Sequence, residues 1–510
     1  MLFNSFEFIF IFLPILCLFS YLFRKNNKAI LSLLLFGSLV FYAYHSVSDL
    51  LLMVTSILIN FFIGQHVRNR KNILPLAIVL NLAIISYFKY SFFIMENVRV
   101  FIPEVLSFEK LALPLGISFF TFQQIAYLVD TYQGNNPERN FLNYALLVSF
   151  FPHSIAGPLV QYKEIAPQFK KVGLSVENIA IGGTIFIVGL FKKIIIADGL
   201  APCANSVFDA ASNGLIPSFL ESWFGAICYT LQLYFDFSGY SDMAVGLAKI
   251  FNISFPLNFD SPYKSTSIID FWRRWHITLS SFLKNYLYTP LGGNRAGNFM
   301  KHRNLLITML IGGLWHGANW TFVFWGGLHG FYLIINHLWR GFCKKRKIGF
   351  VEKKTYLTLC WFLTILAVIF SWVVFRSKNF AIATIMYKSM FGLYGLSVSP
   401  QLNGLIPQFS FINYKGFFAN QIFYFWDYLP LMISSIFICL FFPNIKDFLR
   451  NHVFFHEYHP NSTVNIQETG LIPFTWKPSM MYAILLSIMS IWIVLALLSQ
   501  RKIEFLYFNF

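Results

Sequence analysis

Apolar runs of the length that crosses a lipid bilayer are spread over the whole chain, and they constrain its fold more than any other feature. A membrane-spanning helix needs about 20 predominantly apolar residues. The candidate spans are residues 6–23, 29–44, 50–64, 73–94, 176–197, 223–237, 304–314, 322–338, 356–375, 428–442 and 480–498. We therefore predict an all-α polytopic membrane protein with about 11–13 transmembrane helices, forming one membrane-embedded domain over residues 1–510.

The composition agrees with a membrane protein. Hydrophobic residues make up 56% of the chain and charged residues only 12%, whereas soluble domains carry about 25% charged residues. The mean hydropathy is +0.59. The 62 Phe residues also exceed what one soluble core holds. We find no soluble domain, tandem repeat or low-complexity tail in the sequence.

Two further apolar segments, 113–132 and 144–160, are interrupted by polar or helix-breaking residues. Irregular backbone at membrane depth is tolerated only where it is buried in protein or lines a cavity. The stretch from His153 to Pro158 therefore predicts a re-entrant segment. For His153 itself, a structural role in this hairpin is favoured over catalysis.

The basic loops predict the topology. Loops 24–28 and 68–71 are rich in Lys and Arg, whereas the turn 45–49 has neither, and residues 340–354 hold a third basic cluster. Because basic loops stay in the cytoplasm, the N-terminus is expected outside. The basic residues of loop 24–28 follow the first apolar run, so this run is not expected to be a cleaved signal peptide.

The C-terminus is expected outside as well, in the periplasm. Three crossings separate it from the cytoplasmic loop 340–354, at 356–375, 428–442 and 480–498. The net charge of +17 is largely accounted for by cytoplasmic loops. Contact with anionic lipid headgroups explains such loops better than nucleic-acid binding does.

The six cysteines are scattered, at positions 17, 203, 228, 343, 360 and 439. They form no CxxC pair, and most lie in or near apolar segments, where free cysteine behaves as a small hydrophobe. We expect neither a disulfide framework nor a metal site.

His316 lies in the middle of an apolar stretch and is the leading catalytic candidate. An ionisable side chain kept at membrane depth indicates function, and histidine exchanges protons near neutral pH. Gly312, Gly313 and Gly317 allow close approach of a helix or a substrate. A buried histidine bonded between helices has the same pattern, so both roles stay open. Asn319 is expected to line a funnel or serve structurally; His329, at i+4 from Trp325, is a weaker candidate.

His276 lies in the most charged aromatic segment of the chain. The pattern Ser267-Ile-Ile-Asp270 predicts a helix start, and this amphipathic interfacial helix is expected to run to about Tyr288. On it, Arg273, His276 and Ser280 would share one face, and Asp270 and Arg274, four residues apart, can pair. Arg273 and Arg274 would bind an anionic substrate, such as the phosphates of a nucleotide-bearing donor. A plain interfacial anchor is the alternative, but an anchor needs no histidine.

Two carboxylates, Asp236 and Asp242, end an apolar span. Their spacing from histidines does not support a metal site. Structural pairing with the arginines of the next helix is favoured.

Several motifs, taken in order, resemble one known family. Residues 232–242, 258–263, 270–281, 288–295 and 312–320 are similar to the membrane-bound O-acyltransferase family, especially its alginate O-acetylation branch, as are 114–123 and 155–162. Peptidoglycan O-acetylation and teichoic acid D-alanylation proteins are relatives of that branch. The resemblance covers residues 1–340 well, with its best-matching core at about 110–340, and 377–510 more loosely.

This resemblance implies a many-helix disk with a funnel on each side, meeting at His316, and a second active-site position at His276. It implies acetyl-CoA or a similar cytosolic thioester as donor substrate, with no bound cofactor. The acceptor would be an exported polysaccharide, reached through a separate periplasmic esterase-like transferase. Alginate, another exopolysaccharide and peptidoglycan are not distinguished. A transporter or flippase is the alternative from another class, and an inactive scaffold a third.

The tail that follows the last span, at 480–498, has four aromatic residues in its last six. An interfacial aromatic anchor explains them. The sharper hypothesis is that Tyr507 carries the acyl group before a partner takes it, since tyrosine forms covalent intermediates when a base is near.

Overall fold

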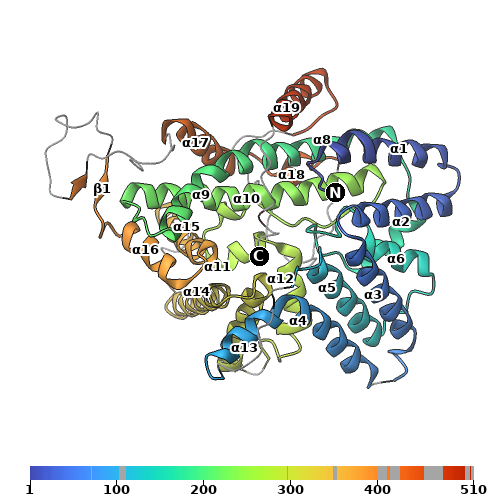
Figure 1. Ribbon diagram of the computed structural model, residues 1–510, viewed down its shortest axis with the longest axis horizontal. Coiled ribbons are helices and arrows are strands. Elements are labelled where there is room, and N and C mark those ends of the chain that lie inside the picture. The colour runs from blue at the N-terminus through green and yellow to red at the C-terminus, as the bar shows by residue number, and fades with distance from the viewer. Residues whose placement is uncertain are drawn as a thin grey trace.

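The computed structural model describes residues 1–70, 72–102, 109, 111–295, 297–347, 353–398, 411–413, 425–452, 475–499 and 506. The described chain is almost entirely helical (Figure 1). Its single pair of described strands, β1 (Leu396–Ser397) and β2 (Ile412–Asn413), is two residues long on each side and parallel. The predicted all-α polytopic fold is confirmed.

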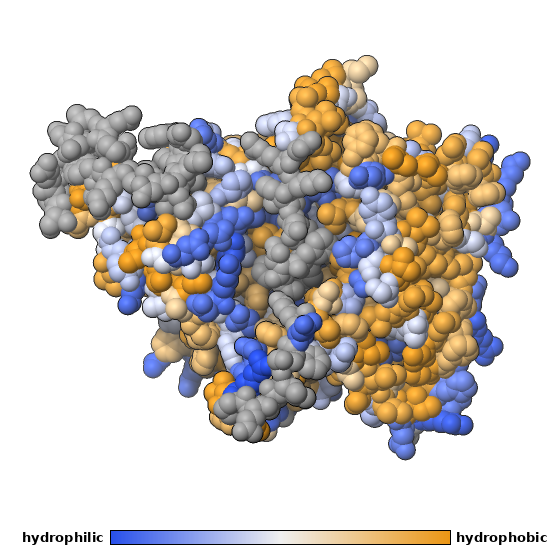
Figure 2. Space-filling view, in the orientation of Figure 1, coloured by the Kyte–Doolittle hydropathy of each residue, from blue (hydrophilic) through white to orange (hydrophobic). Residues whose placement is uncertain are grey.

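The N-terminal half begins with a π-helical turn, η1 (Phe8–Phe12), that leads into the first helix. Its elements are α1 (Leu13–Leu22), α2 (Asn27–Ala43), α3 (Val47–His66), α4 (Ile73–Arg99), α5 (Ile117–Tyr132), α6 (Phe141–Ser149), α7 (Tyr162–Ile165), η2 (Ala166–Lys171), α8 (Val176–Leu190), η3 (Phe191–Ala197), α9 (Asp198–Ser212) and α10 (Phe219–Ile250). Figure 2 shows an extensive apolar surface over the N-terminal helices, as lipid contact requires.

The C-terminal half contains several short elements between long helices. They are η4 (Pro262–Lys264), α11 (Ile268–Arg274), α12 (Ile277–Leu283), η5 (Lys284–Tyr288), α13 (Gly297–His316), α14 (Trp320–Lys345), α15 (Lys354–Arg376), α16 (Phe380–Met390), α17 (Phe425–Phe441), α18 (Ile445–Phe448) and α19 (Met480–Leu498). Helix α19 lies at the edge of the molecule (Figure 1). Only 6% of its most apolar 18-residue stretch is buried inside the protein.

Five described helical stretches are long and apolar enough to cross a membrane: Val47–His66, Ile73–Arg99, Val176–Ser212, Lys354–Arg376 and Met480–Leu498. Helix α10 is not among them although it has 32 residues. It lies in the centre of the molecule (Figure 1) and is buried along nearly its whole length, so protein rather than lipid surrounds it. A helix surrounded by protein can carry polar side chains, and these interrupt the apolar run from which the span was predicted. The predicted span, 223–237, is therefore shorter than the helix.

Helices α8 and α10 pack backbone to backbone at two glycine pairs. A Cβ on Gly182 would lie 2.6 Å from the carbonyl oxygen of Gly246, and one on Gly189 would lie 2.7 Å from that of Gly239. No other residue allows this approach. The close contact places η3, which follows α8, directly against the polar middle of α10.

Hydrogen bonds join the helix ends of the N-terminal half to neighbouring loops. Asn27 donates to the carbonyl of Phe169 at 2.9 Å, and Arg68 donates to Asn136 at 3.2 Å. The backbone N–H of Leu115 donates to Asp49 at 3.1 Å.

The chain between α6 and α7 forms a buried, irregular turn. Its turn, residues 150–158, is buried in protein, and the N–H of Leu159 donates to the hydroxyl of Thr278 at 3.1 Å. His153 lies here against the rings of Phe150 and Phe255. The burial of this turn is compatible with the re-entrant segment, which stays a prediction.

Candidate active site

His316 is the last residue of α13 and is enclosed by aromatic rings. The ring centroids of Trp315, Trp325 and Phe375 lie 4.9, 5.1 and 5.3 Å from that of His316. The side chain is buried, and its Nδ1 has no hydrogen-bond partner among the described residues. An imidazole nitrogen that no protein group occupies is available to a substrate proton.

His329 shows the opposite pattern, although it is close by on α14. Its Nδ1 accepts a hydrogen bond from the indole of Trp272 at 3.2 Å, and its Nε2 lies 2.9 Å from the hydroxyl of Ser371. Both ring nitrogens are therefore used to hold α11, α14 and α15 together. This arrangement indicates a structural histidine.

His276 does not lie within a continuous helix. It separates α11 from α12 and has φ = 44°, in the left-handed region that non-glycine residues rarely adopt. The prediction of one helix from Ser267 to about Tyr288 is therefore wrong. So is the shared face of Arg273, His276 and Ser280, because the break rotates the chain between them.

Asn258 holds this break in place. Its backbone carbonyl accepts from the N–H of Ile277 at 2.9 Å, and its Oδ1 lies 3.1 Å from Nδ1 of His276 and 3.0 Å from the hydroxyl of Thr278. Because Nδ2 of Asn258 donates to Ser241 at 3.0 Å, Oδ1 is the acceptor. His276 consequently carries its proton on Nδ1, and Nε2 has no partner among the described residues.

The two histidines meet at one tryptophan. The ring centroid of Trp315 lies 6.1 Å from that of His276 and 4.9 Å from that of His316. Phe237 and Phe259 complete the surroundings of His276, with centroids at 4.7 and 6.2 Å. Residues that are far apart in sequence thus form one aromatic-lined site with two ring nitrogens free of partners among the described residues.

Lys89 and Tyr90 of α4 bind the end of α13 and were missed by sequence reasoning. Nζ of Lys89 lies 2.5 Å from the carbonyl oxygen of Trp315 and 3.3 Å from that of His316, and the Tyr90 hydroxyl donates to the carbonyl of Leu314 at 3.1 Å. The last carbonyls of a helix lack intrahelical donors. A lysine inside the apolar run 73–94 was the available signal.

The two arginines are not equivalent. Arg274 pairs with Asp270 at 3.1 Å, as predicted, and also donates to the carbonyl of Asp260 at 3.3 Å. Arg273 is exposed and lies near His337 of α14. Arg273 is thus the more exposed of the two, whereas Arg274, half-buried, is held by Asp270 and Asp260.

Asp236 and Asp242 pair with lysines of η3 instead of the predicted arginines. Nζ of Lys193 lies 2.5 Å from Asp236 and 2.8 Å from Asp198, and Nζ of Lys192 lies 2.6 Å from Asp242. The arginine prediction is wrong because the close packing of α8 and α10 brings η3 nearer. Buried charges persist only when paired in this way.

The C-terminal tail reaches this network. The backbone N–H of Leu506, which is buried, donates to Oδ2 of Asp236 at 3.1 Å. Tyr507 lies outside the described residues.

Asn319 caps α14, accepting from the N–H of Thr321 at 3.0 Å and donating to the carbonyl of Lys378 at 3.0 Å.

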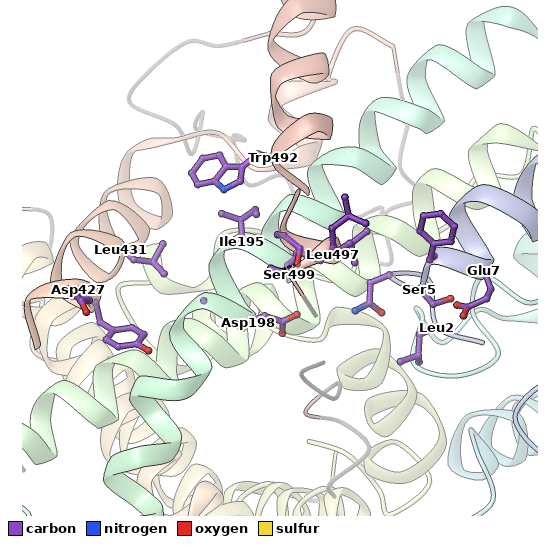
Figure 3. A pocket seen from close by; sticks show the side chains of 17 residues that line it. Leu2, Ser5, Glu7, Ile195, Asp198, Asp427, Leu431, Trp492, Leu497 and Ser499 are labelled. Carbon is purple, nitrogen blue, oxygen red and sulfur yellow. Dashed lines mark hydrogen bonds between the residues drawn. The ribbon is translucent and has the colours of Figure 1, made fainter. Parts of the chain in front are cut away.

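A cavity of about 870 Å³ is lined by Asp198 among other residues. Figure 3 shows Glu7, Asp198, Asp427 and Trp492 around it; Glu7 directly precedes η1, and the other three come from α9, α17 and α19. None of the histidines discussed above lines this cavity. Within the described residues, no group of three or more His, Cys, Asp or Glu side chains is arranged to hold a metal ion.

Comparison with known proteins shows the family of this chain. The model of the membrane-bound O-acyltransferase family matches residues 67–386. The chain is 43% identical to the peptidoglycan O-acetyltransferase of Helicobacter pylori over 435 residues, which is 78% of this chain and 81% of that protein. It is 37% identical to a probable alginate O-acetylase of Pseudomonas putida over the full length of both chains.

A more distant relative, the teichoic acid D-alanyltransferase of Streptococcus thermophilus, is 28% identical over 50% of this chain and 64% of its own. The family match includes α13, α14 and the break at His276. With apolar helices of membrane-spanning length, a histidine pair in an aromatic interior and these relatives, the chain belongs to the membrane-bound O-acyltransferase family and is an O-acyltransferase.

Proposed function

We propose that this enzyme transfers acetyl groups from a cytosolic thioester, acetyl-CoA or a similar donor, to a hydroxyl on the outer side of the inner membrane. The acetyl groups then modify an exported polysaccharide. The observation that carries the proposal is the pair of His316 and His276 around Trp315, each with a ring nitrogen free of partners in the described part of the chain. The relatives named for alginate and peptidoglycan O-acetylation support acetyl as the group.

His316 acts as general base in this proposal. It takes the proton of the attacking hydroxyl, whose oxygen bonds to the thioester carbonyl carbon. The carbon–sulfur bond then breaks, and the proton on His316 passes to the departing thiolate, so the products are an ester and a thiol. The aromatic enclosure keeps water from hydrolysing the thioester.

His276 positions the donor. With its proton on Nδ1 beside Asn258, the neutral ring offers Nε2 as an acceptor, suited to an amide N–H of the donor's thiol arm. Steadying the developing negative charge would require the protonated ring. A pH profile of the reaction distinguishes these roles, because only the second requires His276 to be charged.

The acceptor is a polysaccharide hydroxyl, reached through a separate periplasmic esterase-like transferase. An alginate-like exopolysaccharide is one candidate, supported by relatives of 37 and 42% identity. Peptidoglycan is the second, supported by the 43% relative. Mass spectrometry of acetylated polymers from a deletion strain and its parent separates them, and unchanged acetylation of both would contradict the proposal.

Tyr507 is the proposed acyl carrier. The hydrogen bond from Leu506 to Asp236 ties the preceding residue to the polar middle of α10, which supports a tail that turns inward. Tyr507→Phe retains the aromatic anchor and removes the nucleophilic oxygen. We expect it to stop polymer acetylation while the protein stays in the membrane; full acetylation would leave only the anchoring role.

The proposed topology places both termini in the periplasm. Single cysteines introduced at Lys25 and Arg68 should resist an impermeant thiol reagent added from outside, whereas one at Val47 should react. Labelling of both basic loops from outside would overturn the orientation.

Turnover by the purified protein tests the function as a whole. We expect release of free thiol from acetyl-CoA when an acceptor hydroxyl is supplied, and no release from the His316→Ala variant. A transporter would move its substrate without cleaving a thioester, so donor cleavage excludes that alternative.

A further inference from the structure

A second, smaller cavity lies where α14 ends and α15 begins. Its volume is about 410 Å³. The described residues that line it include Ser267, Asn336, Trp339, Arg340, Lys344 and Lys347. It shares no lining residue with the cavity of Figure 3 or with the histidine site. In the sequence, this basic region indicated only which side of the membrane the loop 340–354 lies on.

The charge around this cavity has one sign. Arg340, Lys344 and Lys347 line it, and no carboxylate does among the described lining residues. Nearby, His337 lies 3.3 Å from Nζ of Lys301 and within electrostatic reach of Arg273. These like charges repel one another, and a bound anion would relieve the repulsion.

The polar groups in the wall are ready for a ligand that both accepts and donates hydrogen bonds. Oδ1 of Asn336 is buried and has no partner among the described residues. Nη2 of Arg340 donates to the hydroxyl of Ser267 at 3.0 Å, which leaves other guanidinium N–H groups for a bidentate contact. Helix α15 starts at Lys354, and the side chain of its N-cap residue, Lys353, makes no capping hydrogen bond.

Aromatic side chains define the outer rim. The indole of Trp339 donates to the hydroxyl of Tyr356 at 2.7 Å, which joins α14 to α15 beside the cavity. Both aromatic residues line it, and Trp339 is exposed. Tryptophan and tyrosine with this exposure are typical of the headgroup level of a bilayer.

We propose that this cavity binds a phosphate group at the cytoplasmic membrane surface. Arg340, Lys344 and Lys347 neutralise the phosphate, and Asn336 accepts a hydrogen bond from a neighbouring donor group on the same ligand. Two ligands carry this chemistry: the thioester donor, through its nucleotide phosphates, and an anionic phospholipid with a hydroxyl-bearing headgroup.

The position of Ser267 connects this cavity to the histidine site. Its hydroxyl caps α11, accepting from the N–H of Asp270 at 3.2 Å, and α11 ends at Arg274, two residues before His276. Ser267 therefore belongs both to the wall of this cavity and to the helix that leads to His276. The donor version of the inference rests on the proposed function; the phospholipid version does not.

Direct binding to the full-length protein in detergent tests the inference without using enzyme activity. The probes are acetyl-CoA, short-chain phosphatidylglycerol, and two matched controls without phosphate, acetyl-pantetheine and a short-chain diacylglycerol. We expect at least one phosphate-bearing probe to bind roughly 10-fold or more tightly than its control, because charge-assisted bonds to phosphate are lost in the control.

A double substitution, Lys344→Gln with Lys347→Gln, should remove this preference. The matched control is Lys345→Gln with Lys353→Gln, which removes the same charge from the same region at positions that do not line the cavity. Asn336→Asp should also weaken binding of the phosphate-bearing probe, because it places a negative charge in the cavity wall without changing the size of the side chain.

The two probes separate the two sources. Selective loss of acetyl-CoA binding assigns the cavity to the donor, and selective loss of phosphatidylglycerol binding assigns it to lipid. Equal binding of every probe to the cavity variant and to the matched control overturns the inference. Failure of the proposed function alone would leave probe binding intact while polymer acetylation is absent.

Discussion

Nζ of Lys89 lies 2.5 Å from the carbonyl oxygen of Trp315, the residue between the rings of His276 and His316. Together with the hydrogen bond from Tyr90 to the carbonyl of Leu314, this contact fixes the carbonyl end of α13 to α4. A cation at the C-terminal end of a helix also interacts favourably with the helix dipole. The position of His316 is thus set by a helix that is distant in the sequence.

Replacing Lys89 by Met should lower the rate of acetyl transfer by roughly 10- to 100-fold, because a catalytic group displaced by about 1 Å loses that much. Lys89→Arg retains the cation and should recover most of the rate. Tyr90→Phe removes one of the two clamps and should have a smaller effect. The measurement is kcat with purified protein; equal rates for Lys89→Met and wild type would contradict a positioning role.

His316 and His329 should respond in opposite ways to substitution. His316→Ala removes the general base and should lower the rate by roughly 100- to 10,000-fold, with little change in thermal unfolding. His329→Ala breaks the bonds to Trp272 and Ser371 and should lower the unfolding temperature first. A His316→Ala protein that fails to accumulate in the membrane would point to packing instead.

Asn258 should matter through His276. Asn258→Leu leaves Nδ1 of His276 and the hydroxyl of Thr278 buried without their acceptor, which should cost about 1–3 kcal/mol of folding free energy. Asn258→Asp keeps an acceptor oxygen and should retain more activity than Asn258→Leu. Because neither variant touches His316, residual donor cleavage in both is the expected outcome, and complete inactivity of Asn258→Asp with normal stability would contradict this role.

Lys193 should be more important for stability than for chemistry. It is 2% exposed and contacts both Asp198 and Asp236. Lys193→Met leaves two buried carboxylates without their cation, and breaking a buried pair in this way typically costs about 3–5 kcal/mol. Adding Asp198→Asn and Asp236→Asn should restore part of the loss. Thermal unfolding in detergent gives the comparison; a single variant as stable as wild type would contradict the assignment.

Local properties of the sequence determined much of this protein. The apolar runs placed most of the helices, since the free energy of burying a run in lipid depends on the residues of that run alone. The same logic made His316 the leading catalytic candidate, because an ionisable residue inside an apolar run is costly wherever the run packs. The Asp270–Arg274 pair was predictable for the same reason, being one helical turn apart.

Only the tertiary structure decided the details of the site. No local pattern marks the break at His276, since it is held by Asn258 from another part of the chain. The lysine partners of Asp236 and Asp242 follow from the glycine contacts between α8 and α10, and the clamp of Lys89 on α13 joins residues 226 positions apart. Each of these features depends on which helices pack against each other. The hydropathy of a helix does not show its packing partner, because lipid and a neighbouring helix are equally apolar surroundings.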